Sequence, residues 1–322
     1  SGACRSFPKN SLQSGGEDMR RRHLQIIGIN PARFDRSQIK FFLYLVPITV
    51  LMGLPIVFIF FNAFKPLDEL LNYPPKFYTL RPTLQNFRNL MATSANKAIP
   101  MSRYLFNSVL TTLAVVFFTL MITTMAAYCM SKKNYRLKNL LFGINEAALM
   151  FVSAAVAIPR YIIVSRLGLV DSIWAHIIPM LSMPVGLYLV KQFIDDLPDE
   201  MIEAARLDGA GDFYILRRIV LPNIKPTLAT VAILAFQASW NSMEASNYYI
   251  NNEALKSFSF YMSTLTQASG NANAMVGQLA GNAVAGLGMQ AAATLIMFLP
   301  NLILFIILQS RVMNTMSHSG MK

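Results

Sequence analysis

Six long apolar stretches, separated by segments rich in polar, charged and turn-forming residues, dominate the pattern of the chain. About 20 apolar residues in a helix, at about 1.5 Å of rise each, cross the roughly 30 Å hydrocarbon core of a bilayer. The stretches are continuous and do not alternate, which favours helices over the strands of a membrane barrel. The pattern predicts an all-α membrane protein with six transmembrane helices, at 41–61, 104–130, 140–159, 173–194, 228–243 and 287–308.

The composition agrees with lipid as the surrounding solvent. Hydrophobic residues make up 54% of the 322 and charged residues 14%, about half the charged share of an ordinary soluble domain. Too few polar residues remain to cover a water-exposed surface, which argues against a water-soluble monomer. Cys4 and Cys129 lie far apart and the chain has no C-x-x-C pair, so we expect no disulfide framework and no metal or other cofactor in this chain.

Basic residues set the predicted orientation. Most of the 28 Lys and Arg residues lie in residues 1–40, in the 131–138 turn, in 191–225 and in the C-terminal tail. The positive-inside rule then places these segments, and with them the N- and C-termini, in the cytoplasm. Loops that face anionic head groups account for the net charge of +12, and we expect no nucleic-acid partner.

A short helix with its own start and stop signals is predicted between the fourth and fifth spans. Residues 198–200 favour a helix start and Gly209 favours a stop, because it can adopt the left-handed backbone. The small side chains of Ala204 and Ala205 would let another backbone approach closely, and Glu203 offers a charge-assisted hydrogen bond. The segment is interpreted as a docking knob, and a helix that merely lies on the head groups is the alternative.

The spacing in this segment carries a family resemblance. It runs Glu203-Ala204-Ala205, three residues, Gly209, nine residues, Ile219, one residue, Leu221-Pro222. This resembles the EAA signature of binding-protein-dependent ABC importer permeases, whose loop forms a coupling helix that docks on a cytoplasmic ATPase. The resemblance implies the type I ABC importer permease fold, and it implies ATPase coupling for Glu203, Ala204, Ala205, Asp208 and Gly209.

The resemblance extends over most of the chain, to the carbohydrate branch typified by the maltose permease subunit MalG. It rests on short motifs at Lys65–Glu69, Pro74–Phe77, Thr83–Phe87, Asn107-Ser108, Ala126–Tyr128, Ile158-Pro159, Gly168–Asp171, Gln192-Phe193, Phe236 and Trp240-Asn241. The tail Met316–Lys322 is similar to the branch found beside permeases for complex or pectin-type oligosaccharides. After Trp240-Asn241 the chain departs from the branch, so sugar contacts cannot be carried over.

The expected function is therefore that of this permease family. The resemblance implies a permease subunit that forms half of the pathway for ATP-driven uptake of a sugar or oligosaccharide, in the bacterial cytoplasmic membrane. It implies four kinds of partner: a second homologous permease subunit, two cytoplasmic ATPase subunits that bind ATP and Mg, an extracellular or periplasmic solute-binding protein, and the sugar.

The predicted topology divides the chain into three parts. Residues 1–39 are a cytoplasmic N-terminal segment, whose polar residues 1–18 are interpreted as a leader or a cloning-derived extension. Residues 40–310 are the transmembrane permease domain, with the coupling-helix loop at 197–222. Residues 311–322 are a cytoplasmic tail.

Four residues are candidates for the substrate pathway. A charge at the centre of a span costs about 2.5 to 3.5 kcal/mol, so Glu146 in the third span serves either a helix-packing hydrogen bond or translocation. Glu244 is predicted one helical turn after Trp240, with Asn241 beside it, and an aromatic face next to amide and carboxylate groups is suited to binding sugar rings. Interfacial anchoring is the alternative for Trp240.

Motifs for chemistry on a substrate are missing from the sequence. It has no G-x-x-x-x-G-K-[ST] loop, no H-E-x-x-H and no G-x-S-x-G turn, so we expect no enzyme activity in this chain, and ATP hydrolysis falls to partner subunits. An ion-coupled secondary transporter subunit is the alternative function. Such a protein should show inverted repeats and buried ionisable relays, and neither is visible in the sequence.

Overall fold

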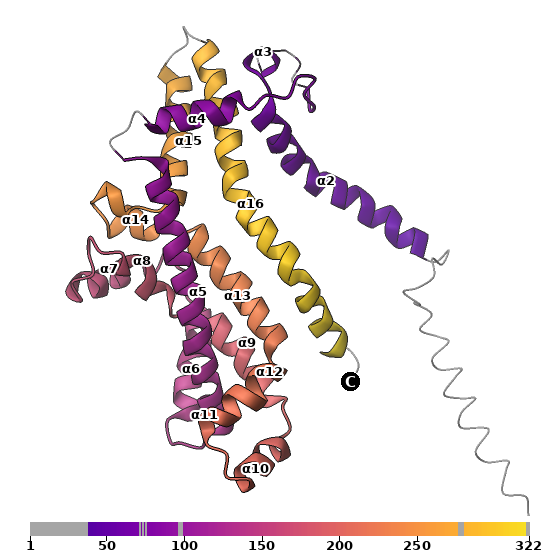
Figure 1. The fold of residues 1–322 in the computed structure, drawn as a ribbon, viewed down its shortest axis with the longest axis vertical. Helices are drawn as coiled ribbons and strands as arrows, with labels where there is room; N and C mark the ends of the chain where they lie inside the picture. The colour runs from indigo at the N-terminus through magenta and orange to yellow at the C-terminus, as the bar shows by residue number, and fades with distance from the viewer. Residues whose placement is uncertain are drawn as a thin grey trace, which may run out of the picture. The chain divides into compact units, whose positions relative to one another are not determined.

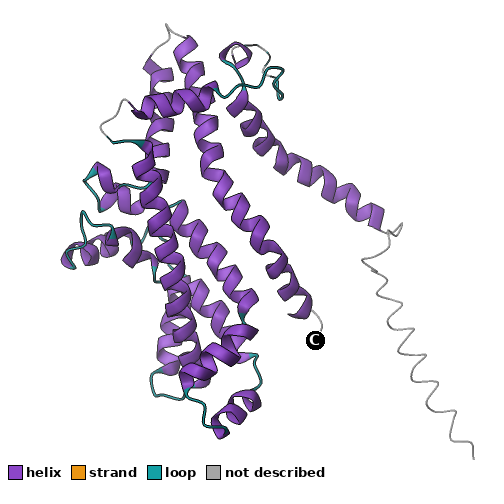
Figure 2. Cartoon of the chain, viewed as in Figure 1, coloured by secondary structure: helices purple, strands orange, loops and turns teal. Residues whose placement is uncertain are grey.

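The computed structural model describes residues 38–319 apart from 71, 73, 75, 96–98 and 276–279. Most of the described residues are helical and none of them lies in a strand, which confirms the all-α prediction (Figures 1 and 2). The chain divides into two units, Ser1–Val57 and Phe58–Lys322. The predicted leader and most of the predicted N-terminal segment lie outside the described residues.

In the described part of the chain, three single helices are long and apolar enough to cross a membrane. They are α2 (Gln38–Phe64), α5 (Met101–Lys132) and α16 (Ala280–Ser319), whose apolar windows are Phe41–Phe64, Met101–Lys132 and Leu287–Gln309. These helices confirm the first, second and sixth predicted apolar helices. Two prolines, Pro47 and Pro55, lie inside α2, and Pro300 lies inside α16.

The fourth and fifth predicted spans are helix pairs bent at a break. Helix α8 (Trp174–Ile177) and the short η1 (Ile178–Met180) meet α9 (Pro184–Asp195) at 45°. The stretch Asp212–Asn223, which contains α11 (Asp212–Ile215), η2 (Leu216–Val220) and α12 (Leu221–Asn223), meets the stretch Lys225–Tyr248 at 83°. The latter contains α13 (Lys225–Trp240) and α14 (Glu244–Tyr248). The described residues therefore offer three to five spans.

The third predicted span, 140–159, is not one helix, and this prediction was wrong. Helix α6 (Lys138–Leu149) ends after 12 residues, and α7 (Ala157–Arg166) begins only after a break. Pro159 lies in the first turn of α7, where its missing N–H is tolerated, which agrees with a new helix that begins at Ala157. The mostly apolar sequence does not reveal this break, since hydropathy does not register backbone geometry.

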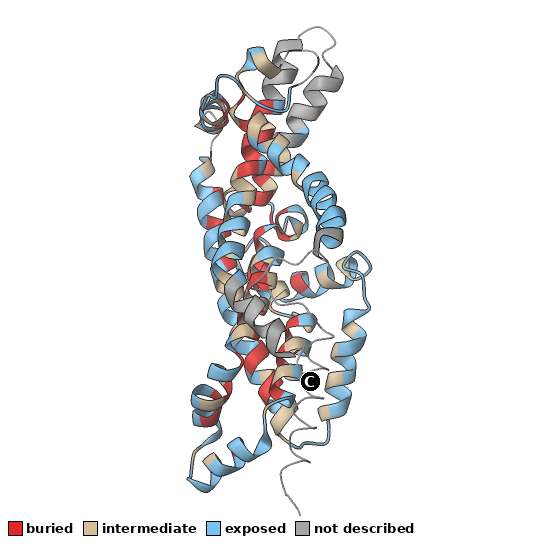
Figure 3. Ribbon diagram, turned by 90° about the vertical axis from the view of Figure 1, so that its right-hand side faces the viewer, coloured by how far each residue is buried: buried red, intermediate tan, exposed pale blue. Residues whose placement is uncertain are grey.

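The hydrophobic core of the larger unit lies where α5, α9 and α13 pack (Figure 3). One cluster of buried residues joins side chains from α5, α9 and the 202–224 segment, including Tyr128, Val190 and Ile202. A second cluster around Trp240 joins α5, α13, α15 (Phe258–Met275) and α16. The remaining short helices are α3 (Leu67–Leu70), α4 (Gln85–Ala95), α10 (Asp199–Leu207) and η3 (Glu253–Leu255).

Candidate functional site

The predicted knob is a nine-residue helix, α10, which Figure 1 shows at one end of the larger unit. Pro198 precedes its first residue, and Asp199 and Glu200 lie in its first turn, where acidic side chains favour the helix dipole. The helix ends at Leu207, and Gly209 follows as the predicted stop, with a φ of +80° that is a left-handed conformation costing other residues energy. The predicted start and stop signals are therefore confirmed.

One face of α10 packs on the bundle and the other is open. Ile202 is buried in the core cluster, and Ala205 packs partly buried against it. Glu203 and Ala204 are exposed, and Leu207 is 90% exposed at the tip. The two alanines therefore differ in their surroundings, because Ala205 faces the core and Ala204 lies on the exposed surface. The open surface of α10 thus carries the carboxylate of Glu203 and the apolar side chain of Leu207.

The C-terminal end of α5 holds α10 in place. Lys132 Nζ donates to the carbonyl oxygen of Leu197 at 2.8 Å and to Asp199 Oδ1 at 2.7 Å. The Lys132 side chain is only 7% exposed, so it reaches both partners from within the bundle. The hydrogen bond from Lys132 also lowers the pKa of Asp199 from its usual range.

A second set of contacts from α5 holds the segment after Gly209. Lys133 Nζ lies 2.6 Å from Asp212 Oδ2, and the Tyr128 hydroxyl donates to Asp212 Oδ1 at 3.4 Å. Arg206 on α10 lies 3.8 Å from the same carboxylate. Asp212 thus links α5 with α10 at the first turn of α11. Asp212 belongs to no motif predicted from the sequence, and its only signal there is a carboxylate that directly follows Gly209 and Gly211.

Trp240 is a core residue in this structure. It is 4% exposed, its ring stacks on Phe236 with centroids 5.8 Å apart, and its Nε1 donates to the carbonyl oxygen of Met297 at 3.1 Å. The indole therefore joins α13 to α16. The predicted spacing to Glu244 was wrong, because α13 ends at Trp240 and Glu244 begins a new helix after a break.

We expect Trp240→Ala to destabilise the folded chain. Truncating a buried tryptophan costs about 3 to 5 kcal/mol through lost packing and the cavity left behind, and the hydrogen bond to Met297 disappears with it. Thermal unfolding of the assembled protein in detergent measures the change, and Trp240→Phe should lose much less because it keeps the stack on Phe236. An unchanged melting temperature together with lost sugar uptake would instead favour direct contact between Trp240 and sugar.

The other predicted pathway residues lie apart from one another. The Asn241 side chain donates to the carbonyl oxygen of Gln237 at 3.0 Å and accepts from the Asn301 amide at 3.4 Å, so it joins α13 to α16. Glu146 is exposed on α6, whose neighbour Asn145 donates to the carbonyl oxygen of Pro184 at 3.2 Å. Among the described residues, the hydrogen bonds and ion pairs of Trp240 and Glu244 do not include Glu146.

Glu244 is bound to Arg160, a residue that the sequence analysis missed. Arg160 Nη1 donates to both carboxylate oxygens of Glu244, at 2.9 and 2.7 Å, and the Tyr249 hydroxyl donates to Oε1 at 2.7 Å. The pair is about three-quarters buried, with side chains 30% and 24% exposed. It connects α7 to α14, the helices that follow the two breaks at 150–156 and 241–243.

Besides the Arg160–Glu244 pair, a second clamp holds the loop after α7 to the segment that follows α14. Asp171 has a left-handed φ of +59°, and its Oδ1 accepts from the backbone N–H groups of Asn251 and Asn252 at 2.6 and 2.9 Å. The backbone donors of Asn252 and Asn251 lower the pKa of Asp171 from its usual range. Together with Arg160 and Glu244, this clamp fixes α7 against the segment 244–252.

Comparison with known proteins places these features in a family. Residues 119–310 match the model of the binding-protein-dependent transport system inner membrane component family. The arabinooligosaccharides transport system permease protein AraQ of Bacillus subtilis is 23% identical over 290 residues, which cover 90% of this chain and 98% of AraQ. The sulfoquinovosyl glycerol transport system permease protein SmoH of Agrobacterium fabrum is 28% identical over 204 residues, which cover 63% of this chain and 70% of SmoH.

A solved structure shares the fold. A chain of a bacterial ABC transporter involved in the import of the acidic polysaccharide alginate superposes with a TM-score of 0.72 at 20% identity. The superposition covers 86% of this chain and 98% of the other. At this identity the likeness concerns the fold, and it extends over nearly all of both chains.

Proposed function

Since the chain belongs to the family of binding-protein-dependent transport system inner membrane components, we propose that it forms half of the membrane pathway of an ABC importer for a sugar or oligosaccharide. The observation that carries this proposal is α10, a short helix with one face buried in the bundle and one face open at Glu203, Ala204 and Leu207. The chain itself does no chemistry on the sugar and holds no cofactor, and ATP and Mg bind to partner ATPase subunits.

Two features of the chain lead to the proposed partners. One permease subunit forms only half of the pathway, and one face of α10 is exposed. A second homologous permease subunit completes the pathway, and each permease docks its α10 on one of two cytoplasmic ATPase subunits. An extracellular or periplasmic binding protein delivers the sugar. The complex lies in the bacterial cytoplasmic membrane with both termini of this chain in the cytoplasm. The third of six crossings then consists of α6 and the broken segment 150–156.

The coupling residues act through their placement. Glu203 and Ala204 contact the ATPase, Ala205 anchors the helix to the core, and Asp208 and Gly209 turn the chain back toward the bundle. When ATP draws the ATPases together, α10 moves with them, and its contacts with Lys132 and Ile202 transfer that movement to α5 and the core. The pathway then opens outward, and hydrolysis returns it to the inward-facing state.

Purification of the native complex tests this function. The chain should co-isolate with an ATPase and a second permease. In proteoliposomes, ATP hydrolysis should rise several-fold when the binding protein carries an oligosaccharide that raises its melting temperature. A matched sample without the ATPase should show no uptake of that sugar. Uptake that proceeds without the ATPase and follows an ion gradient would overturn the proposal and favour the secondary transporter.

A further inference from the structure

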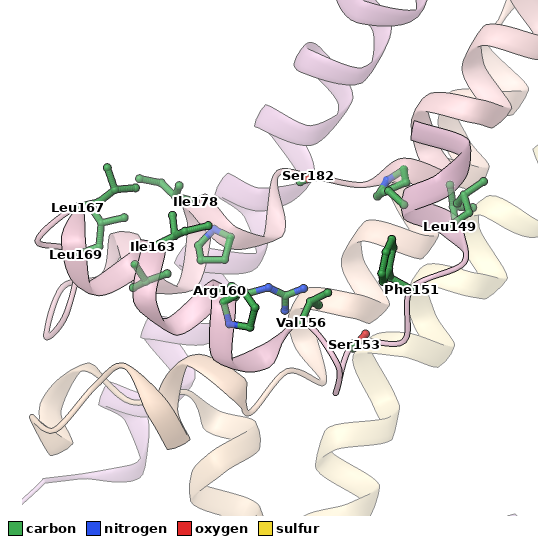
Figure 4. Close-up of a pocket in the computed structure, with 16 residues that line it drawn as sticks. Leu149, Phe151, Ser153, Val156, Arg160, Ile163, Leu167, Leu169, Ile178 and Ser182 are labelled. Carbon is green, nitrogen blue, oxygen red and sulfur yellow. The ribbon is translucent and has the colours of Figure 1, made fainter. Parts of the chain in front are cut away.

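A pocket of about 680 Å³ lies between the end of α6, the helix α7, η1 and the beginning of α9 (Figure 4). Both helix breaks of this region contribute to its wall. Phe151 and Ser153 come from the break between α6 and α7, and Ser182 comes from the break between η1 and α9. Most of the remaining wall is aliphatic.

Prolines mark the beginnings of the helices around the pocket. Pro159, Pro179 and Pro184 all line the pocket, and each lies at the beginning of a helix, where its missing N–H costs least. Irregular backbone at membrane depth must be covered by protein or face water, because lipid offers its polar groups no hydrogen bond. Two such breaks facing one pocket favour a water-filled space over one occupied by lipid.

Arg160 is the charged residue of the pocket wall. Figure 4 shows its side chain extending along the pocket toward Val156. A guanidinium has five N–H donors, and in the described part of the chain both bonds from Arg160 to Glu244 leave through Nη1. The donors on Nε and Nη2 are therefore available to a ligand. Glu244, which itself accepts from Tyr249, holds the guanidinium in position.

We infer that this pocket is a contact site for the transported sugar, in which Arg160 donates hydrogen bonds to ring hydroxyls. The inference rests on the proposed function and names the residues that touch the sugar in this chain. Ser153 and Ser182 supply further hydroxyl partners, and Phe151 and Val156 pack on the C–H faces of a ring. Because Glu244 balances the charge of Arg160, the site suits a neutral ring better than a uronate.

Glu244 is then a positioning residue and not a sugar ligand. Its two oxygens are occupied by Arg160 and Tyr249, so it acts on the sugar through the guanidinium. This changes the role predicted from the sequence, where Glu244 and Trp240 together formed the candidate site. The two residues belong to different surroundings, since Trp240 is buried between α13 and α16.

Thiol labelling of the assembled transporter tests the pocket. The background variant replaces Cys4 and Cys129 by serine, and Ser182→Cys then adds one thiol to the pocket wall. Labelling with a charged, membrane-impermeant maleimide is followed in nanodiscs without sugar, with arabinotetraose and with tetragalacturonate. Phe117→Cys is the matched control, because Phe117 is 63% exposed on the apolar surface of α5.

The expected result is rapid labelling of the Ser182→Cys thiol that arabinotetraose slows at least about threefold, with tetragalacturonate slowing it less. The Phe117→Cys thiol should label slowly with or without sugar. A Ser182→Cys thiol that does not label, or whose labelling neither sugar slows, overturns the inference, and stronger protection by tetragalacturonate overturns the preference for a neutral ring. ATP-driven uptake by the same background variant is measured separately, and its loss would count against the proposed function.

Discussion

Replacing Gly209 by valine is expected to weaken strongly the coupling of ATP hydrolysis to sugar uptake. Gly209 ends α10 with a φ of +80°, and a β-branched residue is strongly disfavoured in this region. The strain of about 1 to 2 kcal/mol or more would move the end of α10. Because every 1.4 kcal/mol is about a tenfold change in an equilibrium, binding-protein-stimulated hydrolysis and uptake should both fall about tenfold.

Gly211→Val is the matched control for this experiment. Gly211 lies two residues later with an ordinary extended φ of −72°, and, as at Gly209, an added Cβ would meet nothing within 4 Å. The control should therefore keep most of its sugar-stimulated hydrolysis and uptake. Both variants are compared at equal amounts of assembled complex in the membrane. Equal activity of the two variants would contradict a role for the left-handed turn in coupling.

The variant Glu203→Ala separates docking from helix geometry. Glu203 is exposed on the open face of α10, so its loss should leave the chain folded. The expected defect is weaker co-isolation with the ATPase and a smaller fall in stimulated hydrolysis than Gly209→Val causes. The two variants thus distinguish a lost contact from a displaced helix.

The sequence predicted those parts of the fold that depend on hydropathy or on a single backbone requirement. Continuous apolar runs predicted α2, α5 and α16, and a helix dipole followed by glycine predicted both ends of α10. The same pattern failed at 140–159, because hydropathy does not register that the backbone leaves the helix after Leu149. It failed again at Trp240, since the apolar run did not reveal that α13 ends there.

Arg160 shows why a contact between distant segments is hard to predict from sequence. Its partner Glu244 is 84 residues away, and neither residue belongs to a recognisable motif. A signal is present all the same, because a charge next to an apolar run needs an opposite charge, and Glu244 is one of the few charges near the predicted spans. Pairing those few charges makes a contact between α7 and α14 one of several that the sequence allows.

The charge-swapped variant Arg160→Glu/Glu244→Arg is expected to restore folding without restoring sugar affinity. Each single reversal places two like charges in contact within a largely buried site, and loss of a partner there costs about 3 to 5 kcal/mol. The single variants should therefore accumulate poorly in the membrane. The double variant restores an opposite pair and should recover most of the assembled complex.

Sugar uptake by the double variant then distinguishes the two roles of the pair. If Arg160 only clamps α7 to α14, the swap should recover uptake together with assembly. If its free donors contact ring hydroxyls, a carboxylate at position 160 cannot donate, so KM for the sugar should rise about tenfold while the maximal rate per assembled complex falls much less. If uptake recovers with an unchanged KM, the ion pair between positions 160 and 244 serves only to connect α7 to α14, and residue 160 does not contact the sugar. The reason is that only a sugar contact requires a hydrogen-bond donor at position 160 on the pocket side.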